Sequence, residues 1–257
     1  MTTETKGRFA GKVALVTGGN SGIGLAAAQA FAREGARVLI AARRREEGNA
    51  AVAGIAAAGG EAAFVETDVA DSASVRNMVA ACVERFGRLD IAFNNAGFPG
   101  QVDALITEAD EERFDQVMAV NVRGVWLSMK YEIPAMLEAG AGSIINCASI
   151  TGLRGGQRSG AYYTSKHAVV GMTKAIAMEF AAKNVRVNAV CPGLVMTDML
   201  GAALAKAPEK FEMLKAKVSM QRMGEPDEVA DTVLWLASDE SRYVTGVALP
   251  VDGGMSI

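Results

Sequence analysis

The chain has 257 residues, of which half are hydrophobic, and a net charge of −3. This length allows one α/β domain with a full core, and the charge gives no electrostatic case for nucleic-acid binding. The scattered cysteines and the single histidine, His167, argue against a zinc site. The stretch from Met1 to Lys12 is polar and lacks the apolar core of a signal peptide, and no stretch approaches the about 20 apolar residues needed to span a bilayer. We therefore expect a cytoplasmic protein with no membrane or nucleic-acid partner.

The first predicted elements form a strand, a glycine-rich turn, a helix and a second strand. The ranges are Lys12–Val16, Thr17–Gly24, a helix to about Glu34, and Val38–Ala41. Glycines at such a turn permit a tight bend, close approach of the backbone to a pyrophosphate, and close packing of helix on strand. Free N–H groups at the helix start can then bind phosphates. The turn predicts a dinucleotide site that includes Gly18, Asn20, Ser21, Gly22, Ile23 and Gly24.

The middle of the chain continues the alternation of strand and helix. We expect a helix over Arg45–Ala58, a strand over Ala62–Val65, a helix over Ser72–Phe86 capped by Asp71 or Ser72, and a strand over Leu89–Phe93. A long helix from about Glu111 to Leu137 carries Asn121. A capping box of Thr107 and Asp110 is predicted to start it, and Pro134 to bend or fray its far end.

The last third contains a strand over Ser143–Ala148, a helix from about Gly160 to Ala182, a strand over Val185–Val190, a helix from Pro226 to about Leu236, and a strand over Val247–Val251. Leu194–Arg222 is predicted to form two short helices and a mobile cover over the cleft. The alternation predicts an α/β protein with a single domain over residues 1–257. Its fold is expected to be doubly wound and Rossmann-type, with about seven parallel strands and helices on both faces.

Tyr162 and Lys166 are four residues apart, so they lie on one face of the predicted helix. A free phenol is a poor acid or base at neutral pH, but an ammonium within reach stabilises the phenolate and makes proton transfer accessible. Ser149 ends a strand at the sheet edge where ligands bind, and its hydroxyl could donate to a substrate oxygen. On this spacing alone, a half-buried ring beside a solvated lysine remains the alternative.

Taken together, the motifs resemble the short-chain dehydrogenase/reductase family over about Gly11 to Gly254. They are Thr17-Gly18-x-x-x-Gly22-x-Gly24, Asn94–Gly97, Asn121, Ser149, Tyr162-x-x-x-Lys166 and Pro192-Gly193. The separation of Ser149 and Tyr162 is the one usual in the family. The resemblance implies an NAD(P)-dependent oxidoreductase that interconverts a ketone or aldehyde and a secondary alcohol.

The resemblance also assigns roles. Tyr162 would be the general acid and base, Lys166 would hold the nicotinamide ribose, and Ser149 would polarise the carbonyl. Asn121 would hold a water that relays protons, or would simply be a buried amide that ties helix backbone. Further cofactor contacts would come from Asp68, Val69, Asn95, Ala96, Gly97, Pro192, Gly193, Val195 and Thr197, although Asp68 could equally be a turn residue. Neighbouring side chains without an assigned role are expected to be structural, namely Tyr163, His167, Cys147 and Cys191.

The end of the second strand favours NADP over NAD. NAD enzymes of this type place an acid there to bind the ribose 2′-hydroxyl. This chain has Ala42 followed by Arg43, and a guanidinium suits a 2′-phosphate. Asn20 and Ser21 stand where many NADP forms have a basic residue, and the arginines could be a solvated helix start, so NAD stays the alternative.

Two other functions remain open. One is a dinucleotide-binding regulatory protein without turnover. The other is a 3-oxoacyl-carrier reductase, which would need a basic docking patch such as Arg123, Arg154 and Arg158. The substrate is a small molecule that the sequence does not identify, and family resemblance implies a homotetramer. Phe98, Leu153 and Arg154 could reach the substrate. The cover would line an apolar pocket, or pack two helices together, through Met196, Met199, Leu200, Leu204, Phe211, Met213, Leu214 and Met220.

Overall fold

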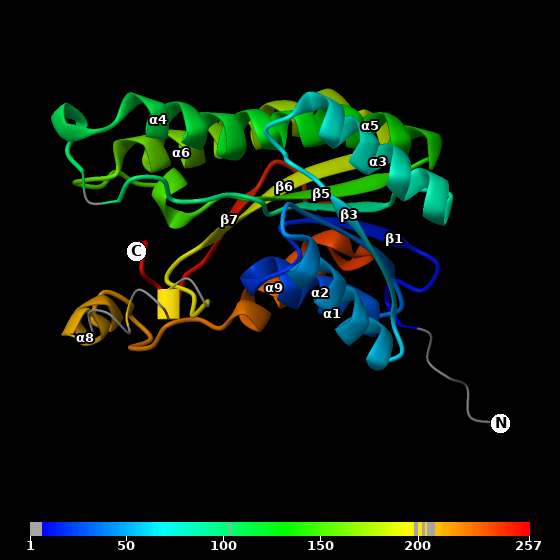
Figure 1. The fold of residues 1–257 in the computed structure, drawn as a ribbon, viewed down its shortest axis with the longest axis horizontal. Coiled ribbons are helices and arrows are strands. Elements are labelled where there is room, and N and C mark those ends of the chain that lie inside the picture. The colour runs from blue at the N-terminus through cyan, green and yellow to red at the C-terminus, as the bar shows by residue number, and fades with distance from the viewer. Residues whose placement is uncertain (1–6, 103, 198–199, 202–203, 205–208) are drawn as a thin grey trace.

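The computed structural model describes residues 7–102, 104–197, 200–201, 204 and 209–257. Its centre is a parallel sheet of seven strands in the order β3-β2-β1-β4-β5-β6-β7 (Figure 1). The predicted α/β class and doubly wound topology are confirmed. The strands are β1 (Val13–Thr17), β2 (Arg37–Ala42), β3 (Glu61–Glu66), β4 (Ile91–Asn94), β5 (Gly142–Cys147), β6 (Val185–Pro192) and β7 (Ala248–Val251).

Helices cover both faces of this sheet (Figure 1). On one face lie α1 (Gly22–Arg33), α2 (Arg45–Ala57) and α9 (Pro226–Ala237), with Pro226 at the helix start as predicted. The other face carries α3 (Ser72–Phe86), α5 (Val125–Glu138) and α6 (Gly160–Phe180), with α4 (Glu111–Met118) leading into α5. Each face has its own buried apolar cluster. β1, β2 and β4 are accordingly near-continuous apolar runs, because both of their sides are buried, whereas the edge strands β3 and β7 are partly exposed.

The direction of winding reverses between β1 and β4, and this reversal positions the site. β1 pairs with β2 on one side and with β4 on the other. The loops that follow β1 and β4 are joined there. The backbone N–H groups of Asn95 and Ala96 donate to Thr17 Oγ1 at 3.0 and 3.1 Å, and Asn95 Nδ2 donates to Gly18 O at 3.3 Å. Ligands of open α/β sheets bind in the crevice at such a switch point.

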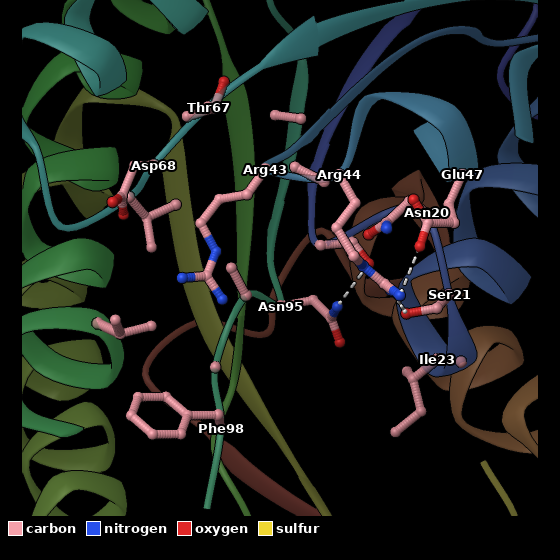
Figure 2. Close-up of a pocket in the computed structure, with 18 of the residues that line it drawn as sticks. Asn20, Ser21, Ile23, Arg43, Arg44, Glu47, Thr67, Asp68, Asn95 and Phe98 are labelled. Carbon is pink, nitrogen blue, oxygen red and sulfur yellow. Dashed lines mark hydrogen bonds and ion pairs between the residues drawn. The ribbon is translucent and has the colours of Figure 1, made fainter. Parts of the chain in front are cut away.

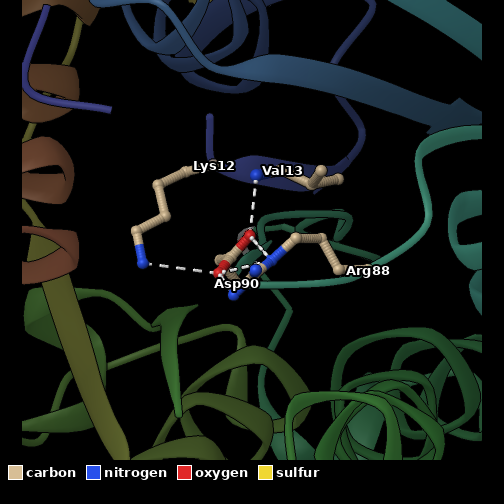
Figure 3. A network of polar contacts seen from close by, with 4 residues as sticks. All are labelled: Lys12, Val13, Arg88 and Asp90. Carbon is tan, nitrogen blue, oxygen red and sulfur yellow. Dashed lines mark hydrogen bonds and ion pairs between the residues drawn. The ribbon is translucent and has the colours of Figure 1, made fainter. Parts of the chain in front are cut away.

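At the amino ends of β1 and β4, away from the cavity, a buried carboxylate links the two strands (Figure 3). Asp90 is 5% exposed and accepts from the Val13 N–H at 2.9 Å. Arg88 donates to both of its oxygens, through Nη2 at 2.6 Å and Nε at 2.9 Å, and Lys12 Nζ lies 3.5 Å away. Asp90 lies just before β4 and satisfies the first backbone donor of β1, so it fixes the start of β1 relative to β4.

The predicted long helix is interrupted, which the sequence did not indicate. α4 ends at Met118, and a π-helical turn over Ala119–Gly124 precedes α5. Gly124 packs against Val69, since a Cβ there would lie 3.0 Å from the valine side chain. π-bulges of this kind gather at functional sites. The turn holds Asn121.

Of the helix caps predicted from the sequence, the one for α3 is confirmed and the one for α4 is wrong in part. Asp71 caps α3 by accepting from the Ser74 N–H at 2.7 Å, as expected. The capping box of Thr107 and Asp110 is wrong, because Asp110 itself caps α4 and Thr107 lies in a separate 3₁₀ turn. α5 continues beyond Pro134 to Glu138.

The predicted cover over Leu194–Arg222 is only partly described. α8 spans Glu209–Lys215, and Val195 forms an isolated bridge with Gly224. Met199 lies outside the described residues. The division into one domain with a covering segment stays a prediction. Within the described part of the chain, no helix is both long and apolar enough to cross a membrane.

Candidate active site

A cavity of about 690 Å³ opens at the carboxyl edge of the sheet, at the switch point between β1 and β4 (Figure 2). Its walls come from the glycine-rich turn, the ends of β2, β3 and β4, and the π-helical turn. Most of the predicted cofactor residues line it: Gly18, Asn20, Ser21, Gly22, Ile23, Arg43, Asp68, Val69, Asn95, Ala96, Gly97 and Thr197.

The glycine-rich turn is shaped by contacts that leave no room for a side chain. Gly18 has a φ of +66°, a left-handed conformation that favours glycine. A Cβ on Gly24 would lie 2.2 Å from the Gly18 carbonyl oxygen. Gly24 does not line the cavity itself, but it lets α1 pack closely against the turn that does.

The start of α1 borders this cavity, and its N–H groups receive no side-chain cap from Ser21. Ser21 precedes the helix without capping it through its side chain, and the first turn contains no acidic residue. Asn20 Nδ2 is buried and has no partner among the described residues. Free N–H groups at a helix N-terminus favour an anion, so this end of the cavity suits the pyrophosphate of a dinucleotide.

The three successive arginines have different surroundings. Arg44 donates to Glu47 at 2.8 Å and to Ser21 Oγ at 3.3 Å, and Arg45 donates to Glu66 at 2.7 Å. Arg43 has no hydrogen bond or ion pair among the described residues, and its side chain extends into the cavity (Figure 2). It brings into the cavity a positive charge with no ion-pair partner among the described residues.

The contacts of Asp68 fit both a turn residue and a cofactor contact. Its Oδ1 accepts from the Ala70 N–H at 3.0 Å, which is the contact of a turn residue. Its side chain also borders the cavity (Figure 2).

Lys166 and Tyr162 share one face of α6, as their spacing predicts. Lys166 is only 5% exposed, and its Nζ lies 5.5 Å from the centroid of the Tyr162 ring. The same Nζ donates to the Cys147 carbonyl oxygen at 2.8 Å, at the end of β5. The Tyr162 hydroxyl has no hydrogen bond within the described part of the chain. The ammonium is thus anchored beside a phenol whose hydroxyl remains available.

Lys166 lies beside the cavity, although neither it nor Tyr162 is among the residues that line it. A Cβ on Gly97, which does line the cavity, would lie 3.7 Å from Lys166 Nζ and 3.1 Å from Asn121 Oδ1. Gly97 therefore marks the place where a cofactor in the cavity would meet the lysine.

Ser149 lies at the carboxyl end of β5, beside the end of β6. It is 8% exposed, accepts from the Thr151 N–H at 3.2 Å, and is 3.5 Å from the Pro192 carbonyl oxygen. The weak contact with Pro192 leaves its hydroxyl able to donate elsewhere. Gly193 follows, and its N–H donates to the Val251 carbonyl at 3.0 Å.

The amide of Asn121 is occupied by protein contacts. Its Oδ1 accepts from the Phe98 N–H at 3.0 Å, while Nδ2 donates to Phe98 O at 2.9 Å and to Ser165 Oγ at 3.2 Å. Ser165 Oγ in turn donates to the Tyr162 carbonyl oxygen at 2.8 Å. These bonds match the alternative of a structural amide and tie the cavity end to α6. The water relay through Asn121 stays a prediction.

Some residues depart from the predicted set. Val195 lines a second cavity of about 380 Å³, between the Leu194–Arg222 segment and the end of β7. Arg44, Glu47, Thr67 and Val120 line the main cavity although they were not assigned to it. Thr67 could have been found, because it directly follows β3, whereas Val120 depends on the π-helical turn.

The remaining polar neighbours make local contacts, and their structural role stays a prediction. The Tyr163 hydroxyl packs against Gly156, and the His167 ring contacts the Tyr163 carbonyl at 3.0 Å. Burial raises the pKa of the Cys147 thiol, and raises that of Cys191 to about 12. Neither thiol is a thiolate at neutral pH, so neither is a nucleophile there.

Comparison with known proteins gives concordant matches. Residues 18–256 match the family model described as enoyl-(acyl carrier protein) reductase. The chain is 42% identical to 2,5-dichloro-2,5-cyclohexadiene-1,4-diol dehydrogenase LinX of Sphingobium indicum, over 97% of this chain and 98% of that protein. It is 41% identical to the A-factor type gamma-butyrolactone 1'-reductase (1S-forming) of Streptomyces virginiae, over 99% of each.

A solved structure agrees with these sequence matches. An actinorhodin polyketide ketoreductase variant with NADPH superposes with a TM-score of 0.91 at 38% identity, covering 95% of this chain and 97% of that one. The fold, the cavity at the switch point and these relatives lead to one assignment. The chain belongs to the short-chain dehydrogenase/reductase family and is a nicotinamide-dependent oxidoreductase of alcohol and carbonyl groups.

Proposed function

We propose that this enzyme reduces a small, uncharged ketone, and oxidises the corresponding secondary alcohol, with NADP as cofactor and Tyr162, Lys166 and Ser149 as its catalytic residues. The carrying observation is the buried Lys166 ammonium, fixed 5.5 Å from the Tyr162 ring at the end of the cavity. NADP, when bound, supplies or accepts the hydride.

The chain's own residues would manage the proton. In reduction, the Tyr162 hydroxyl donates its proton to the carbonyl oxygen as negative charge develops there, and Ser149 Oγ–H donates a hydrogen bond to the same oxygen. Lys166 stabilises the resulting phenolate electrostatically. Alcohol oxidation uses the same groups in reverse, with the phenolate as base.

Arg43 supports NADP as the preferred cofactor. Its guanidinium is unpaired among the described residues, and it directly follows Ala42, which stands at the end of β2 where an acid would bind a free ribose hydroxyl. A 2′-phosphate would give this charge a bidentate partner. Glu47 also lines the cavity, but its charge is compensated by Arg44 at 2.8 Å.

The contacts of two arginines and the named relatives favour a small substrate that is not bound to a carrier. Arg123 donates to the Ala70 carbonyl, and Arg154 donates to the Met255 carbonyl at 2.8 Å. Two members of the conceivable basic docking patch are therefore engaged with the protein's own backbone. Relatives named for a cyclohexadienediol and for a butyrolactone support a cyclic substrate.

The test is a screen of cyclic ketones, secondary alcohols and carrier-bound 3-oxoacyl substrates, each assayed with NADPH or NADH and with NADP⁺ or NAD⁺. We expect turnover of uncharged cyclic substrates, with a higher kcat/KM for the phosphorylated cofactor. Turnover with NADH alone would overturn the cofactor assignment. Turnover of carrier-bound acyl substrates alone would overturn the substrate class.

A further inference from the structure

A buried carboxyl group lies beneath the site, on α5. Glu132 is fully buried, and its Oε2 accepts from Asn94 Nδ2 at 3.1 Å. Asn94 Nδ2 also donates to Asn146 Oδ1 at 3.1 Å, and Asn146 Nδ2 donates to Thr173 Oγ1 at 2.9 Å. A row of buried polar side chains thus crosses from α5, over β4 and β5, to α6.

This row contains two acceptors with no donor. Asn94 Oδ1 and Glu132 Oε1 are both buried, and neither has a hydrogen-bond partner among the described residues. No salt bridge within those residues includes Glu132. An ionised carboxylate in such a place would be a buried charge without compensation, which is among the costliest arrangements in a protein.

We propose that Glu132 is a neutral carboxylic acid whose proton sits on Oε1 and is donated to Asn94 Oδ1, so that acid and amide form a ring of two hydrogen bonds. One proton then satisfies both unpartnered acceptors. The inventory balances, because the two hydrogens of Asn94 Nδ2 serve Glu132 Oε2 and Asn146 Oδ1, and Glu132 supplies the missing donor.

The surroundings of Glu132 agree with this protonation. Burial raises the pKa of Glu132 to about 8, with the Asn94 hydrogen bond as a smaller opposing effect. Cys82 on α3 is close enough to Glu132 for their charges to interact. Burial raises the pKa of the Cys82 thiol to about 12. The charged groups on two other packed elements point elsewhere: Arg123 to the Ala70 carbonyl, and Arg186 of β6 to the carbonyls of Ser238 and Val244.

The ring would act on the site through both strand ends. Asn94 directly precedes Asn95, which donates to the glycine-rich turn. Asn146 directly precedes Cys147, whose carbonyl accepts from Lys166. Glu132 is therefore a positioning residue for Lys166, an assignment that rests on the proposed function.

The test compares wild type with Glu132→Gln and Glu132→Leu. Glutamine can replace the acid in the ring, since its N–H takes the place of the carboxyl O–H, whereas leucine of similar size removes the ring. We expect wild type at pH 6 to show the infrared carbonyl band of a protonated buried acid. That band is expected to be absent from Glu132→Gln and to fade in wild type as the pH rises through about 8.

Stability gives an independent measure. Burial raises the pKa of Glu132 from 4.5, its ordinary value, to about 8, so between these two pH values the folded chain is expected to bind one proton more than the unfolded chain. Wild type should therefore lose stability relative to Glu132→Gln as the pH rises through that window, by up to about tenfold in unfolding constant per pH unit. A missing band, or a stability difference that is flat with pH, would overturn the proposal, even if Glu132→Leu does not fold.

Turnover reports on the positioning role. Glu132→Gln should keep the kcat of wild type at pH 7 and retain activity at alkaline pH where wild type loses it. Identical pH profiles for the two proteins would refute the positioning role. If no substrate is turned over by either protein, the proposed function fails, while the spectra and the stability measurements still decide the protonation of Glu132.

Discussion

At the scale of single residues, the three arginines after β2 differ only in what they touch. Arg44 and Arg45 are neutralised by Glu47 and Glu66, while Arg43 reaches the cavity unpaired among the described residues. An ion pair at an exposed site contributes little, but a guanidinium left without a partner in a binding cavity is available to a phosphate. The sequence alone could not show which of the three arginines is left without an ion-pair partner.

We predict that Arg43→Ala weakens NADPH binding by about 10- to 100-fold, the usual loss for a hydrogen bond to a charged group. NADH binding should change little, because NADH lacks the 2′-phosphate. Fluorescence titration of each cofactor measures both constants. The matched control is Arg45→Ala, which removes a guanidinium bound to Glu66 and should leave both affinities intact. Equal weakening of NADH and NADPH by Arg43→Ala would contradict this role.

At the scale of elements, the glycine-rich turn and α1 form one unit because a glycine lies at their contact. We predict that Gly24→Ala displaces the turn, since the added methyl would meet the Gly18 carbonyl at 2.2 Å. Overpacking of this kind costs about 1–3 kcal/mol and here should also weaken cofactor binding.

The matched control for this variant is Gly54→Ala, in the exposed interior of α2, where a Cβ meets nothing within 4 Å. It should stabilise the protein by about 0.5–1 kcal/mol and leave cofactor binding unchanged. Urea unfolding and cofactor titration of both variants provide the measurements. A Gly24→Ala protein that binds NADPH like wild type would show that the turn tolerates a side chain.

The far end of β1 depends on Asp90 instead. We predict that Asp90→Asn lowers the free energy of unfolding by about 1–3 kcal/mol, because an amide turns an N–H toward Arg88 in place of an accepting oxygen. Glu66→Gln disrupts an exposed ion pair and should cost about 0–1 kcal/mol. Similar losses for the two variants in urea titrations would show that the buried contact has no special weight.

The elements themselves were largely predictable, since apolar runs between amphipathic helices specify a parallel sheet. The π-helical turn around Asn121 was not, because its contacts are tertiary: Gly124 packs against Val69, a residue far away in sequence. Glu132 was missed for a related reason. Its partner Asn94 belongs to β4, far away in sequence, and a glutamate in a helix ordinarily indicates a solvated face.

At the scale of the whole molecule, cofactor binding should stabilise the fold, since the cavity joins the loops of several strands. NADPH at about 100 times its dissociation constant adds about 2.7 kcal/mol. For a chain of this size that corresponds to a rise in Tm of roughly 5–10 °C. Thermal melts with NADPH and NADH at equal concentration measure the effect. A larger rise with NADH would contradict the preference for the phosphorylated cofactor.

The homotetramer remains a prediction from family resemblance. Trp126 on α5 and Phe114 on α4 are 47% and 42% exposed in the single chain. Exposed aromatic side chains fit many kinds of partner, so the fold of one chain does not specify the assembly.

The central claim is that Tyr162 is the proton donor and that Lys166 makes it one. Kinetics of Tyr162→Phe, with NADPH affinity determined in parallel, test this most directly. We predict a fall in kcat of about 10²- to 10⁴-fold with an unchanged NADPH dissociation constant, while Tyr163→Phe, whose hydroxyl faces Gly156, stays active. A Tyr162→Phe enzyme with the kcat of wild type would contradict the account.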